Sequence, residues 1–531
     1  MGKNRSTKKS CCKRFGKYLR EYSNFSGIHG VQYFGEKRTY FEKIWWFIVF
    51  VIALSSCVYA ILEVYHKWIR SPVIVTFATQ ETQIYSIPFP AVTICPESKT
   101  NQSLYNHTNI TRKIIENVDL TEDEQNNLNY ISLVCDHGPH TWGFAWGKFI
   151  DENFYEVLAK VNCRSPLNEC EYMGRRVQCD TIFVPIITDD GICYSFNILD
   201  KSDIFKDFVV SNLNFHKADK TNNDWTIETG YAKHLGKHTY PRRALFSGLK
   251  NGLSVSFRST REDIDASCKS GLQGYKVLLH LPSRLPLLSH GYFRVPENEV
   301  VIAGVNPSMI TTSNTLKNYD VAKRNCYFSY EKDLHFFKIY TIRNCKIECL
   351  TNFTLYYCGC VGFYMPRENG TKICGTDLGI QICMLEAADK LQTLNLPDFS
   401  SQNETKTHQF HGNFTACDCL PMCSDLTYNV ELSQSRWNWL SAFRARATNR
   451  TRIDPSGVSV SKLIIFFKTS DFIYSERNEL YGPLDFLANF GGLLGLFTGF
   501  SLLSLMEIVY FLTIRICCNV KLYGHWSGND N

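Results

Sequence analysis

The chain has 531 residues, a formal net charge of +6, 44% hydrophobic residues and 22 cysteines. Its mean hydropathy is slightly negative, so composition alone does not mark a membrane protein. The distribution of apolar and charged residues along the chain is more informative than these averages.

An uncharged apolar run extends from Ile44 to Leu62. It is long enough to cross the ~30 Å hydrocarbon core of a membrane as a helix. Residues 1–43 carry eleven Lys and Arg against three Glu, which places them in the cytoplasm. Such a basic segment could suggest nucleic-acid binding, but beside a membrane span it more simply sets the topology and contacts anionic lipid, so no nucleic-acid partner is expected. A cleaved signal peptide is the alternative, but the run starts too late and is too long for one. We predict a cytoplasmic tail over residues 1–43 and a transmembrane helix over residues 44–64.

A second apolar run of about 28 residues lies further along the chain, and Glu507 is its only charged residue. We predict a transmembrane helix over residues 484–513. Because two spans return the chain to the same side, residues 65–483 form an extracellular domain and residues 514–531 a cytoplasmic tail. The sequence therefore predicts a two-span protein of the plasma membrane with both termini in the cytoplasm.

The predicted extracellular region carries most of the cysteines and many glycosylation sequons. Seventeen of the 22 cysteines lie between Cys95 and Cys423, as expected of a region in an oxidising compartment. N-x-Ser/Thr sequons cluster in the same region, which predicts a glycoprotein. The predicted glycosylation sites are Asn101, Asn106, Asn109, Asn352, Asn369, Asn403, Asn413 and Asn449.

Secondary-structure patterns in this region predict an α+β fold, a mixed sheet with helical lobes around it. Residues 97–165 form a polar peripheral lobe with a helix-like segment from Glu122 to Leu133, and residues 395–415 are typical of a flexible surface loop. Strands are predicted directly after the first span and at residues 181–197, 274–282 and 458–468.

The most regular cysteine pattern lies between residues 326 and 423. CxC and CxxxC spacings can hold zinc, but disulfides are the commoner outcome outside a cell, and they would make a small polar lobe rigid. Spacing alone does not give the pairing. The pattern consists of Cys326, Cys345, Cys349, Cys358, Cys360, Cys374, Cys383, Cys417, Cys419 and Cys423.

Two short motifs allow other chemistry. His137 and His140 flank Gly138-Pro139 and could ligate a metal or sense pH, although solvated loop residues are the plainer interpretation. Asp189-Asp190-Gly191 could belong to a phosphate-binding loop of an ecto-nucleotidase, but such a triplet more commonly forms a turn before a strand.

The second apolar run has features that a simple membrane anchor does not need. It is longer than the bilayer requires, so the helix must tilt or break. Gly491, Gly495 and Gly499 recur every four residues on one helical face, where small residues also allow helices to pack closely. At Gly499 and Ser501, carbonyl and hydroxyl oxygens could replace the water around a small cation. Because two spans cannot enclose a pore, such a chain must oligomerise.

Glu507 lies within the same apolar run. An intramembrane carboxylate costs ~3 kcal/mol on insertion scales and usually faces water, a partner or an ion path. One interpretation places Glu507 near the inner vestibule of a pore, where it favours cations. The other makes it a helix-packing carboxylate that is hydrogen-bonded to a neighbour.

Several stretches of the chain match motifs of one known family. Gly491 to Ser501 (GGLLGLFTGFS), followed by LLSLM and Glu507, resembles a pore-helix signature, and His29-Gly30 and Phe89–Cys95 (FPAVTIC) match motifs on either side of the first span. The cysteine array of residues 326–423 and the two-span topology also match this family. The chain thus resembles the degenerin, acid-sensing and epithelial sodium channels over nearly its whole length, and most of all their insect pickpocket branch.

The resemblance implies a trimer whose extracellular domain has a palm, finger, thumb, knuckle and β-ball, with residues 326–423 as the thumb. It implies that Gly499-Phe500-Ser501 is the selectivity filter for sodium, the permeant ion. His29-Gly30 would pack below the filter in a re-entrant loop and affect gating. Ala488 falls at the degenerin position, where a bulky side chain holds the gate open. Residues Asn489, Gly495 and Glu507 would be associated with the pore.

The resemblance also implies disulfide pairs and limits what carries over. Cys163 and Cys170 match a family disulfide by spacing, but Cys179 could equally be a partner in that pair. The partners of Cys135 and Cys268 are not implied by the resemblance. Asn489 stands where acid-sensing members have an acidic residue, which puts proton gating in doubt. The implied pairs are Cys95–Cys193, Cys326–Cys423, Cys345–Cys419, Cys349–Cys417, Cys358–Cys383 and Cys360–Cys374.

The sequence therefore predicts one subunit of a trimeric, amiloride-sensitive, voltage-insensitive sodium channel, neither an enzyme nor dependent on a cofactor. Its partners would be related subunits in a homo- or heterotrimer, membrane lipid and an extracellular ligand of unknown identity. The channel would be gated by a stimulus in sensory or epithelial cells. Force, acid, a peptide, a chemosensory ligand and constitutive leak all stay open. The alternatives from other classes are a two-span receptor or scavenger protein and an ecto-nucleotidase.

Overall fold

The computed structural model describes residues 3–70, 73–135, 147–162, 165–210, 215–218, 223–232, 239–394, 417–446, 457–480 and 482–527. The chain divides into two compact units. The helical unit comprises Met1–Ile74, Ser313–Tyr319 and Asn478–Asn531, and the sheet unit comprises Val75–Thr312 and Asp320–Arg477.

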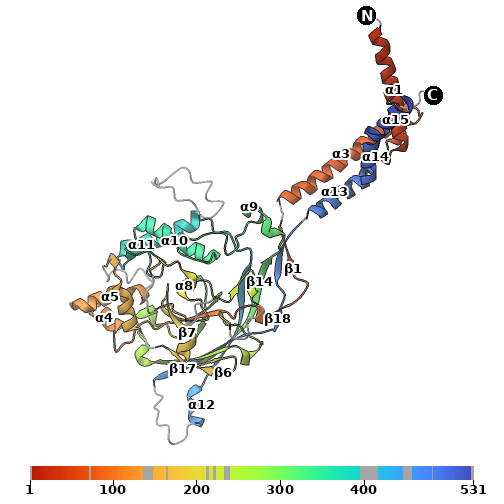
Figure 1. Cartoon of the computed structure of the whole chain (residues 1–531). Coiled ribbons are helices and arrows are strands. Elements are labelled where there is room, and N and C mark those ends of the chain that lie inside the picture. The colour runs from red at the N-terminus through yellow and green to blue at the C-terminus, as the bar shows by residue number, and fades with distance from the viewer. Residues whose placement is uncertain are drawn as a thin grey trace. The chain divides into compact units, whose positions relative to one another are not determined.

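The helical unit contains the two ends of the chain. Two of its helical segments, Tyr40–Arg70 and Leu502–Tyr523, are long and apolar enough to cross a membrane, and Leu484–Thr498 is a shorter apolar helix. The second predicted span is therefore broken rather than one continuous helix. The helices are α1 (Lys3–Phe25), α2 (Gln32–Gly35), α3 (Tyr40–Arg70), α13 (Pro483–Thr498), α14 (Leu502–Leu512) and α15 (Ile514–Tyr523) (Figure 1).

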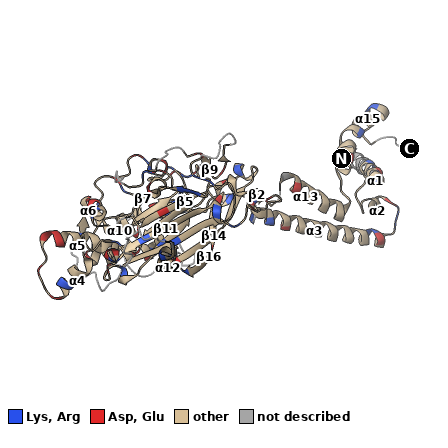
Figure 2. Cartoon of the chain, turned by 90° about the horizontal axis from the view of Figure 1, so that it is seen from below, with Lys and Arg blue, Asp and Glu red and all other residues tan. Residues whose placement is uncertain are grey.

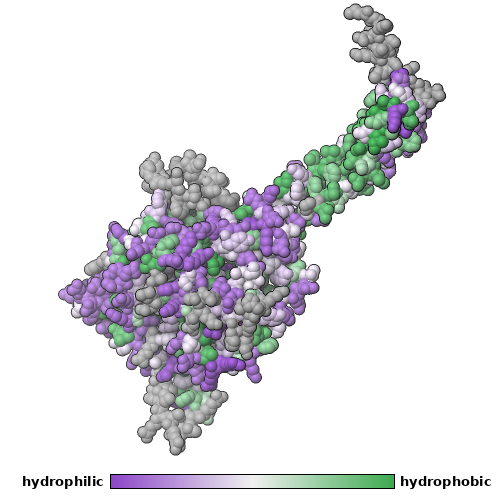
Figure 3. Space-filling model, in the orientation of Figure 1, coloured by the Kyte–Doolittle hydropathy of each residue, from purple (hydrophilic) through white to green (hydrophobic). Residues whose placement is uncertain are grey.

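The surface of helix α3 suits a lipid environment. Trp45 and Phe47 are each 59% exposed and Ile52 is 60% exposed. Leaving such side chains in water costs ~1.5–3 kcal/mol each relative to burial. Charged residues lie near the two ends of α3 (Figure 2), and the helices of this unit present a largely hydrophobic surface (Figure 3). This distribution is what a membrane-spanning helix requires.

Aromatic contacts hold the helical unit together. Trp68 on α3 lies against Phe486 on α13, with ring centroids 5.2 Å apart. Tyr33 on α2 stacks on Trp46 of α3 at 4.0 Å. Contacts of this kind contribute ~0.5–1.5 kcal/mol each beyond the area they bury, so they fix both α2 and α13 against α3.

The remaining elements belong mainly to the sheet unit. Its helices are α4 (His107–Ile115), α5 (Glu122–Cys135), α6 (Asn153–Val161), α7 (Cys179–Ile182), α8 (Lys201–Ile204), α9 (Val321–Arg324), α10 (Ile342–Cys358), α11 (Leu378–Leu394) and α12 (Trp439–Arg446). The strands of the chain are β1 (Val73–Phe77), β2 (Thr82–Gln83), β3 (Ala91–Pro96), β4 (Phe149–Ile150), β5 (Leu167–Tyr172), β6 (Arg175–Val177), β7 (Phe183–Thr188), β8 (Gly191–Phe196), β9 (Trp225–Thr226), β10 (Gly230–Tyr231), β11 (Leu253–Thr260), β12 (Tyr275–His280), β13 (Phe293–Val295), β14 (Glu299–Thr312), β15 (Ile373–Cys374), β16 (Asp425–Arg436), β17 (Val458–Phe467), β18 (Asp471–Phe472) and β19 (Ser475–Glu479).

The largest sheet has eight strands in the order β1-β19-β14-β17-β11-β5-β6, with β16 paired to β14. Strands β14 and β16 are antiparallel from Glu299↔Arg436 to Ile310↔Asp425. Strands β14 and β17 are parallel, so the sheet is mixed as predicted. On β17, Leu463, Ile465 and Phe467 are at most 1% exposed, and their period of two directs them all to one face of the sheet.

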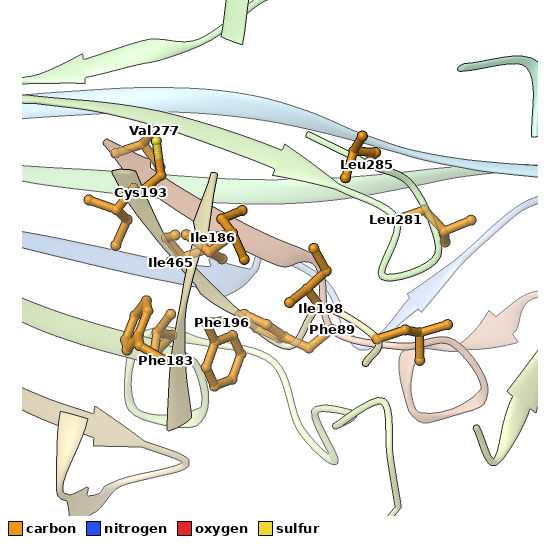
Figure 4. Close-up of a cluster of buried hydrophobic side chains, with 14 of the residues drawn as sticks. Phe89, Phe183, Ile186, Cys193, Phe196, Ile198, Val277, Leu281, Leu285 and Ile465 are labelled. Atoms are coloured by element: carbon orange, nitrogen blue, oxygen red, sulfur yellow. The ribbon is translucent and has the colours of Figure 1, made fainter. Parts of the chain in front are cut away.

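A second, antiparallel sheet has the order β13-β12-β3-β8-β7. The core side chains of the two sheets meet around Phe89, whose ring lies 6.0 Å from Phe196 on β8 (Figure 4). The Phe89 ring also lies 5.5 Å from Phe467 on β17. The strands predicted at residues 181–197, 274–282 and 458–468 are confirmed as β7 with β8, β12 and β17.

Two groups of helices belong to the sheet unit. Helices α4, α5 and α6 share a small core in which Ile131 and Phe154 are fully buried. The helix predicted from Glu122 to Leu133 is confirmed as α5. Helices α10 and α11 lie in the cysteine-rich segment between residues 326 and 423. The loop predicted at residues 395–415 lies outside the described residues.

Eight disulfides join described cysteines, and six of them are the pairs that the family resemblance implies. The other two are Cys135–Cys268 and Cys170–Cys179. Cys179 is therefore the partner of Cys170, while Cys163 lies outside the described residues. Because the ten cysteines between residues 326 and 423 are all paired, none of them is available to ligate zinc.

The predicted glycosylation sites differ in their exposure. Asn109, Asn352 and Asn369 are exposed and Asn106 is half-buried. Asn101 is only 8% exposed, and its side-chain nitrogen donates a hydrogen bond to Asp263 at 3.2 Å. The structure therefore argues against a glycan on Asn101, because the side-chain nitrogen that would carry the glycan is buried and already donates a hydrogen bond to Asp263. Asn403, Asn413 and Asn449 lie outside the described residues.

A buried ion cluster lies at the turn between β7 and β8. Asp190 is 4% exposed and accepts from Lys99 Nζ at 2.6 Å and from Lys276 Nζ at 2.8 Å. Lys269 Nζ lies 3.3 Å from the same carboxylate, and Glu97 lies 3.5 Å from Lys276. Burial alone would raise the pKa of Asp190, but the three ammonium groups hold it below its usual range. The cluster ties together segments that are distant in the sequence.

Candidate functional site

The break in the second apolar segment is centred on Gly499. Helix α13 ends at Thr498, and Gly499 adopts a left-handed conformation with φ 68° and ψ 12°. Ser501 then begins helix α14, since its side chain accepts from the backbone N–H of Ser504 at 3.2 Å. A left-handed residue after a helix is usually glycine, because only glycine adopts this conformation without steric cost. The predicted filter residues Gly499, Phe500 and Ser501 thus form the non-helical link between two helices.

The segment before the first span lies against this break. The backbone N–H of His29 donates to the carbonyl oxygen of Thr498 at 2.9 Å. This carbonyl is one of the four at the end of α13 that have no partner within the helix. His29 therefore caps helix α13 from a part of the chain that is 469 positions earlier in the sequence.

The imidazole ring of His29 lies directly on Gly499. A Cβ atom built on Gly499 would be 2.8 Å from Cγ and Nδ1 of the ring and 2.9 Å from Cε1. Gly30 also has a positive φ, 89°, and a Cβ built on it would lie 3.4 Å from Phe50 on α3. The structure thus brings the predicted gating motif and the predicted filter together, and both rely on the absence of a side chain.

Glu507 takes part in the same contact region. Its Oε2 accepts from the backbone N–H of Gly27 at 3.0 Å. A Cβ built on Gly27 would lie 3.2 Å from the hydroxyl of Ser504 on α14. The observation favours the interpretation of Glu507 as a packing carboxylate hydrogen-bonded to a neighbour. No pattern in the sequence indicated that Gly27 and Ser504 belong to this contact region, because the two residues are distant from each other in the chain.

The other predicted pore residues lie on helix α13. Ala488 and Asn489 are exposed within the chain, and the Asn489 side chain donates to the carbonyl oxygen of Asp485 at 3.0 Å. Among the described residues, and leaving aside the backbone of its own helix, a Cβ built on Gly491 meets nothing within 4 Å, and one built on Gly495 meets only the carbonyl oxygen of Phe500 at 3.8 Å. This glycine face is therefore not covered by any described part of the chain.

The competing sites are not supported by their surroundings. Asp189 and Asp190 form a turn, and Gly191 with φ 94° leads into β8. Both carboxylates bond to groups of the protein, Asp190 to lysines and Asp189 to backbone N–H groups. Among the described residues no group of three or more His, Cys, Asp or Glu could hold a metal ion. His137 and His140 lie outside the described residues.

Comparison with known proteins decides among the remaining interpretations. Residues 22–511 match the family described as "Amiloride-sensitive sodium channel". The chain belongs to the amiloride-sensitive sodium channel family. Pickpocket protein 28 of Drosophila melanogaster is 29% identical over 512 residues, which are 94% of this chain and 78% of that protein.

Other relatives agree. Sodium channel protein Nach of Drosophila melanogaster is 23% identical over 522 residues, covering 95% of this chain and 89% of that protein. Acid-sensing ion channel 1C of Danio rerio is 22% identical over 537 residues, covering 97% and 88%. A solved structure, "Cryo-EM structure of a proton-activated chloride channel", aligns with a TM-score of 0.27 and 8% identity over 88% of this chain and 95% of that one. That similarity is too low to bear on the fold.

Membership in the amiloride-sensitive sodium channel family confirms the predicted class. The chain is a sodium-channel subunit and not an enzyme. Two apolar helices flank a large disulfide-bonded domain, as in a two-span channel protein of the plasma membrane. The ecto-nucleotidase and receptor alternatives are thereby excluded.

The contact of Glu507 with Gly27 predicts how two substitutions at Glu507 will differ. Glu507→Gln keeps an oxygen that can accept from Gly27 N–H, whereas Glu507→Ala removes it. We expect the glutamine variant to retain most of the sodium current and the alanine variant to lose about fivefold, equivalent to ~1 kcal/mol for one hydrogen bond. The measurement is whole-cell current and reversal potential in oocytes, with Ala488→Val as the background and surface protein quantified. Equal losses for both variants, with a shifted reversal potential, would instead support a direct role of the charge in conduction.

Proposed function

We propose that the chain is one subunit of a trimeric, amiloride-sensitive and voltage-insensitive sodium channel, with the non-helical link Gly499-Phe500-Ser501 as its selectivity filter. The observation that carries the proposal is the break at Gly499. A helix that breaks within an apolar segment exposes carbonyl and hydroxyl oxygens, the groups that replace the water shell of a permeating cation.

Oligomerisation follows from the same geometry. One chain supplies a single broken helix, and one helix cannot surround an ion path. The open face at Gly491 and Gly495 would allow helices α13 of neighbouring subunits to approach closely around a common axis. Residues 1–43 and 514–531 would then lie in the cytoplasm and residues 65–483 outside the cell. Related subunits can take the other two positions, so a homotrimer and a heterotrimer are both compatible with this arrangement.

The contacts of His29 suggest how the filter is supported. His29 bonds to Thr498 through its backbone and covers Gly499 with its ring. A movement of the cytoplasmic segment would therefore displace the filter directly. This coupling supports a gating role for His29-Gly30, with the helix break as the element that both ends of the chain influence.

Ala488→Val tests the proposed function. Ala488 is exposed on α13, ten residues before the end of that helix, so a larger side chain there would meet a neighbouring subunit and hold the gate open. We expect oocytes expressing the variant to carry a constitutive current that falls when external sodium is replaced by a large cation. Amiloride should block this current, and it should vary linearly with voltage.

Ala488→Ser is the matched control, since it keeps a small side chain at the same position and should leave the channel closed. Silence of Ala488→Val despite confirmed surface protein would show that a related subunit is required, and coexpression with relatives would then restore the current. Silence with every coexpressed relative would contradict the proposed pore.

A further inference from the structure

A cavity of about 380 Å³ lies in the sheet unit between helices α10 and α11 and the end of α5. Its volume falls within the ~300–1,000 Å³ range of small-molecule sites. Leu350 on α10, Met384 and Leu385 on α11, Leu133 on α5 and Phe363 supply apolar walls. The cavity belongs to the predicted extracellular domain and has no residue in common with the pore helices.

Two hydroxyl groups at this cavity have no hydrogen-bond partner among the described residues. Thr354 on α10 and Thr376 both line the cavity, and they are only 1% and 5% exposed. Neither Oγ1 atom makes a hydrogen bond to any described residue. A buried hydroxyl without a partner costs ~1–3 kcal/mol, so a ligand that bonds to these groups would recover that free energy.

Thr354 differs from other threonines of the chain's helices. Thr351, three residues earlier on α10, donates to the carbonyl oxygen of Ile347 at 2.8 Å. Thr393 on α11 does the same with Asp389 at 2.9 Å. Bonding to the carbonyl four residues earlier is the usual way in which a helical threonine satisfies its hydroxyl. Thr354 does not do so, which leaves its hydroxyl available at the cavity wall.

The charges around the cavity favour an uncharged ligand. No Lys, Arg or His is among the described residues that line it, and Asp189 is the only charged one. Both oxygens of Asp189 already accept backbone N–H groups, from Leu288 and Ser289, at 2.8 Å each. Burial raises the pKa of Tyr364, and nearby Asp189 raises it further, so this phenol stays neutral. An anion would be desolvated here without a counter-charge, which is strongly unfavourable.

We infer that this cavity binds a small, uncharged molecule with an apolar body and one or two hydroxyl, carbonyl or ester oxygens. Leu385 is 55% exposed and Ser289 is exposed, so the site is reached from the surface of the sheet unit. The ligand contacts α10 and α11 together with α5. The inference concerns the extracellular domain, so experiments on the pore residues neither support nor contradict it.

Binding is tested on the purified full-length chain by saturation-transfer difference NMR at pH 7.4. The uncharged probes are 2-phenylethanol, 1-octanol and methyl phenylacetate, and sodium phenylacetate is the anionic comparison of similar shape. We expect saturable binding of at least one uncharged probe and at least tenfold weaker binding of phenylacetate. Thr354→Val and Thr376→Val keep the shape of the side chain but remove the hydroxyl, so each should raise the Kd by about threefold to tenfold. Ala388→Phe, which fills the cavity from α11, should abolish saturable binding.

Thr393→Val is the control, because it removes a threonine hydroxyl from helix α11, which borders the cavity, at a position that does not line the cavity, so it should leave the Kd unchanged. Circular dichroism of every variant separates loss of binding from loss of folding. Three results would overturn the inference: no saturable binding of any uncharged probe, equal binding of phenylacetate, or an unchanged Kd in both cavity Thr→Val variants.

Discussion

Replacing Gly499 with alanine is expected to reduce the sodium current at least tenfold. Gly499 has φ 68°, a conformation that costs other L-residues ~1–2 kcal/mol. The new Cβ would also lie 2.8 Å from the His29 ring, so the ring or the filter backbone must move. Either movement changes the positions of the oxygens at the break. The measurement is amiloride-sensitive current in oocytes carrying Ala488→Val, normalised to surface protein.

Two further variants separate the causes of this loss. Gly492→Ala is the matched control, because a Cβ there meets no described residue outside its own helix within 4 Å and its φ is not positive, so the current should be retained. Adding His29→Ala to Gly499→Ala removes the clash but not the backbone strain, so part of the current should return. Full current in Gly499→Ala alone would show that neither the conformation nor the His29 contact matters to conduction.

The sequence predicted the elements whose signals are local. An uncharged run long enough to span a membrane needs no partner to be recognised, and β17 (Val458–Phe467) is evident from its run of Val, Leu, Ile and Phe residues. The break in the second span was predicted only as one of two outcomes, tilting or breaking. The choice depends on Gly499 and on the Ser501 side chain that begins the next helix, and hydropathy does not contain that information.

Contacts between distant segments could not be derived from the sequence. The hydrogen bond from Gly27 to Glu507 joins residues 480 positions apart, and no periodicity encodes it. The six disulfides implied by the resemblance came from a known family, whereas Cys135–Cys268 and Cys170–Cys179 were left open. The spacing of cysteines gives only their separation along the chain. Which two sulfur atoms lie close enough to bond depends on how the strands and helices are arranged in the fold.

The second large effect is expected at Asp190, for which Asp190→Asn should destabilise the sheet unit by ~3–5 kcal/mol. The substitution leaves the ammonium groups of Lys99, Lys269 and Lys276 buried, and the one ion pair that remains to them among the described residues is Lys276 with Glu97 at 3.5 Å. Buried charges without counter-charges are among the most destabilising features a mutation can create. We expect the variant to be retained inside the cell, measured as loss of surface protein, and the purified chain to unfold at a lower temperature.

Two comparisons identify charge burial as the cause. Asp207→Asn removes a carboxylate that is 92% exposed and pairs with Lys338 at 2.9 Å, so it should cost ~1 kcal/mol or less. Adding Lys269→Met to Asp190→Asn removes one unpaired charge and should restore part of the stability. A double variant no more stable than Asp190→Asn would indicate that shape rather than charge is responsible.

The pH dependence follows from the pKa shifts within the cluster. The stabilisation from ionised Asp190 is present above the usual pKa of an aspartate, ~3.9, and is lost only as the pH falls through its lowered folded value. Extracellular acidification to about pH 5 should therefore leave the cluster intact. Burial lowers the pKa of Lys269 to about 8, so between about pH 8 and pH 10 the unfolded chain binds more protons and stability should rise with pH. Thermal unfolding across this range should show that rise in the wild-type chain but not in Lys269→Met, because the single substitution removes the group that releases the proton.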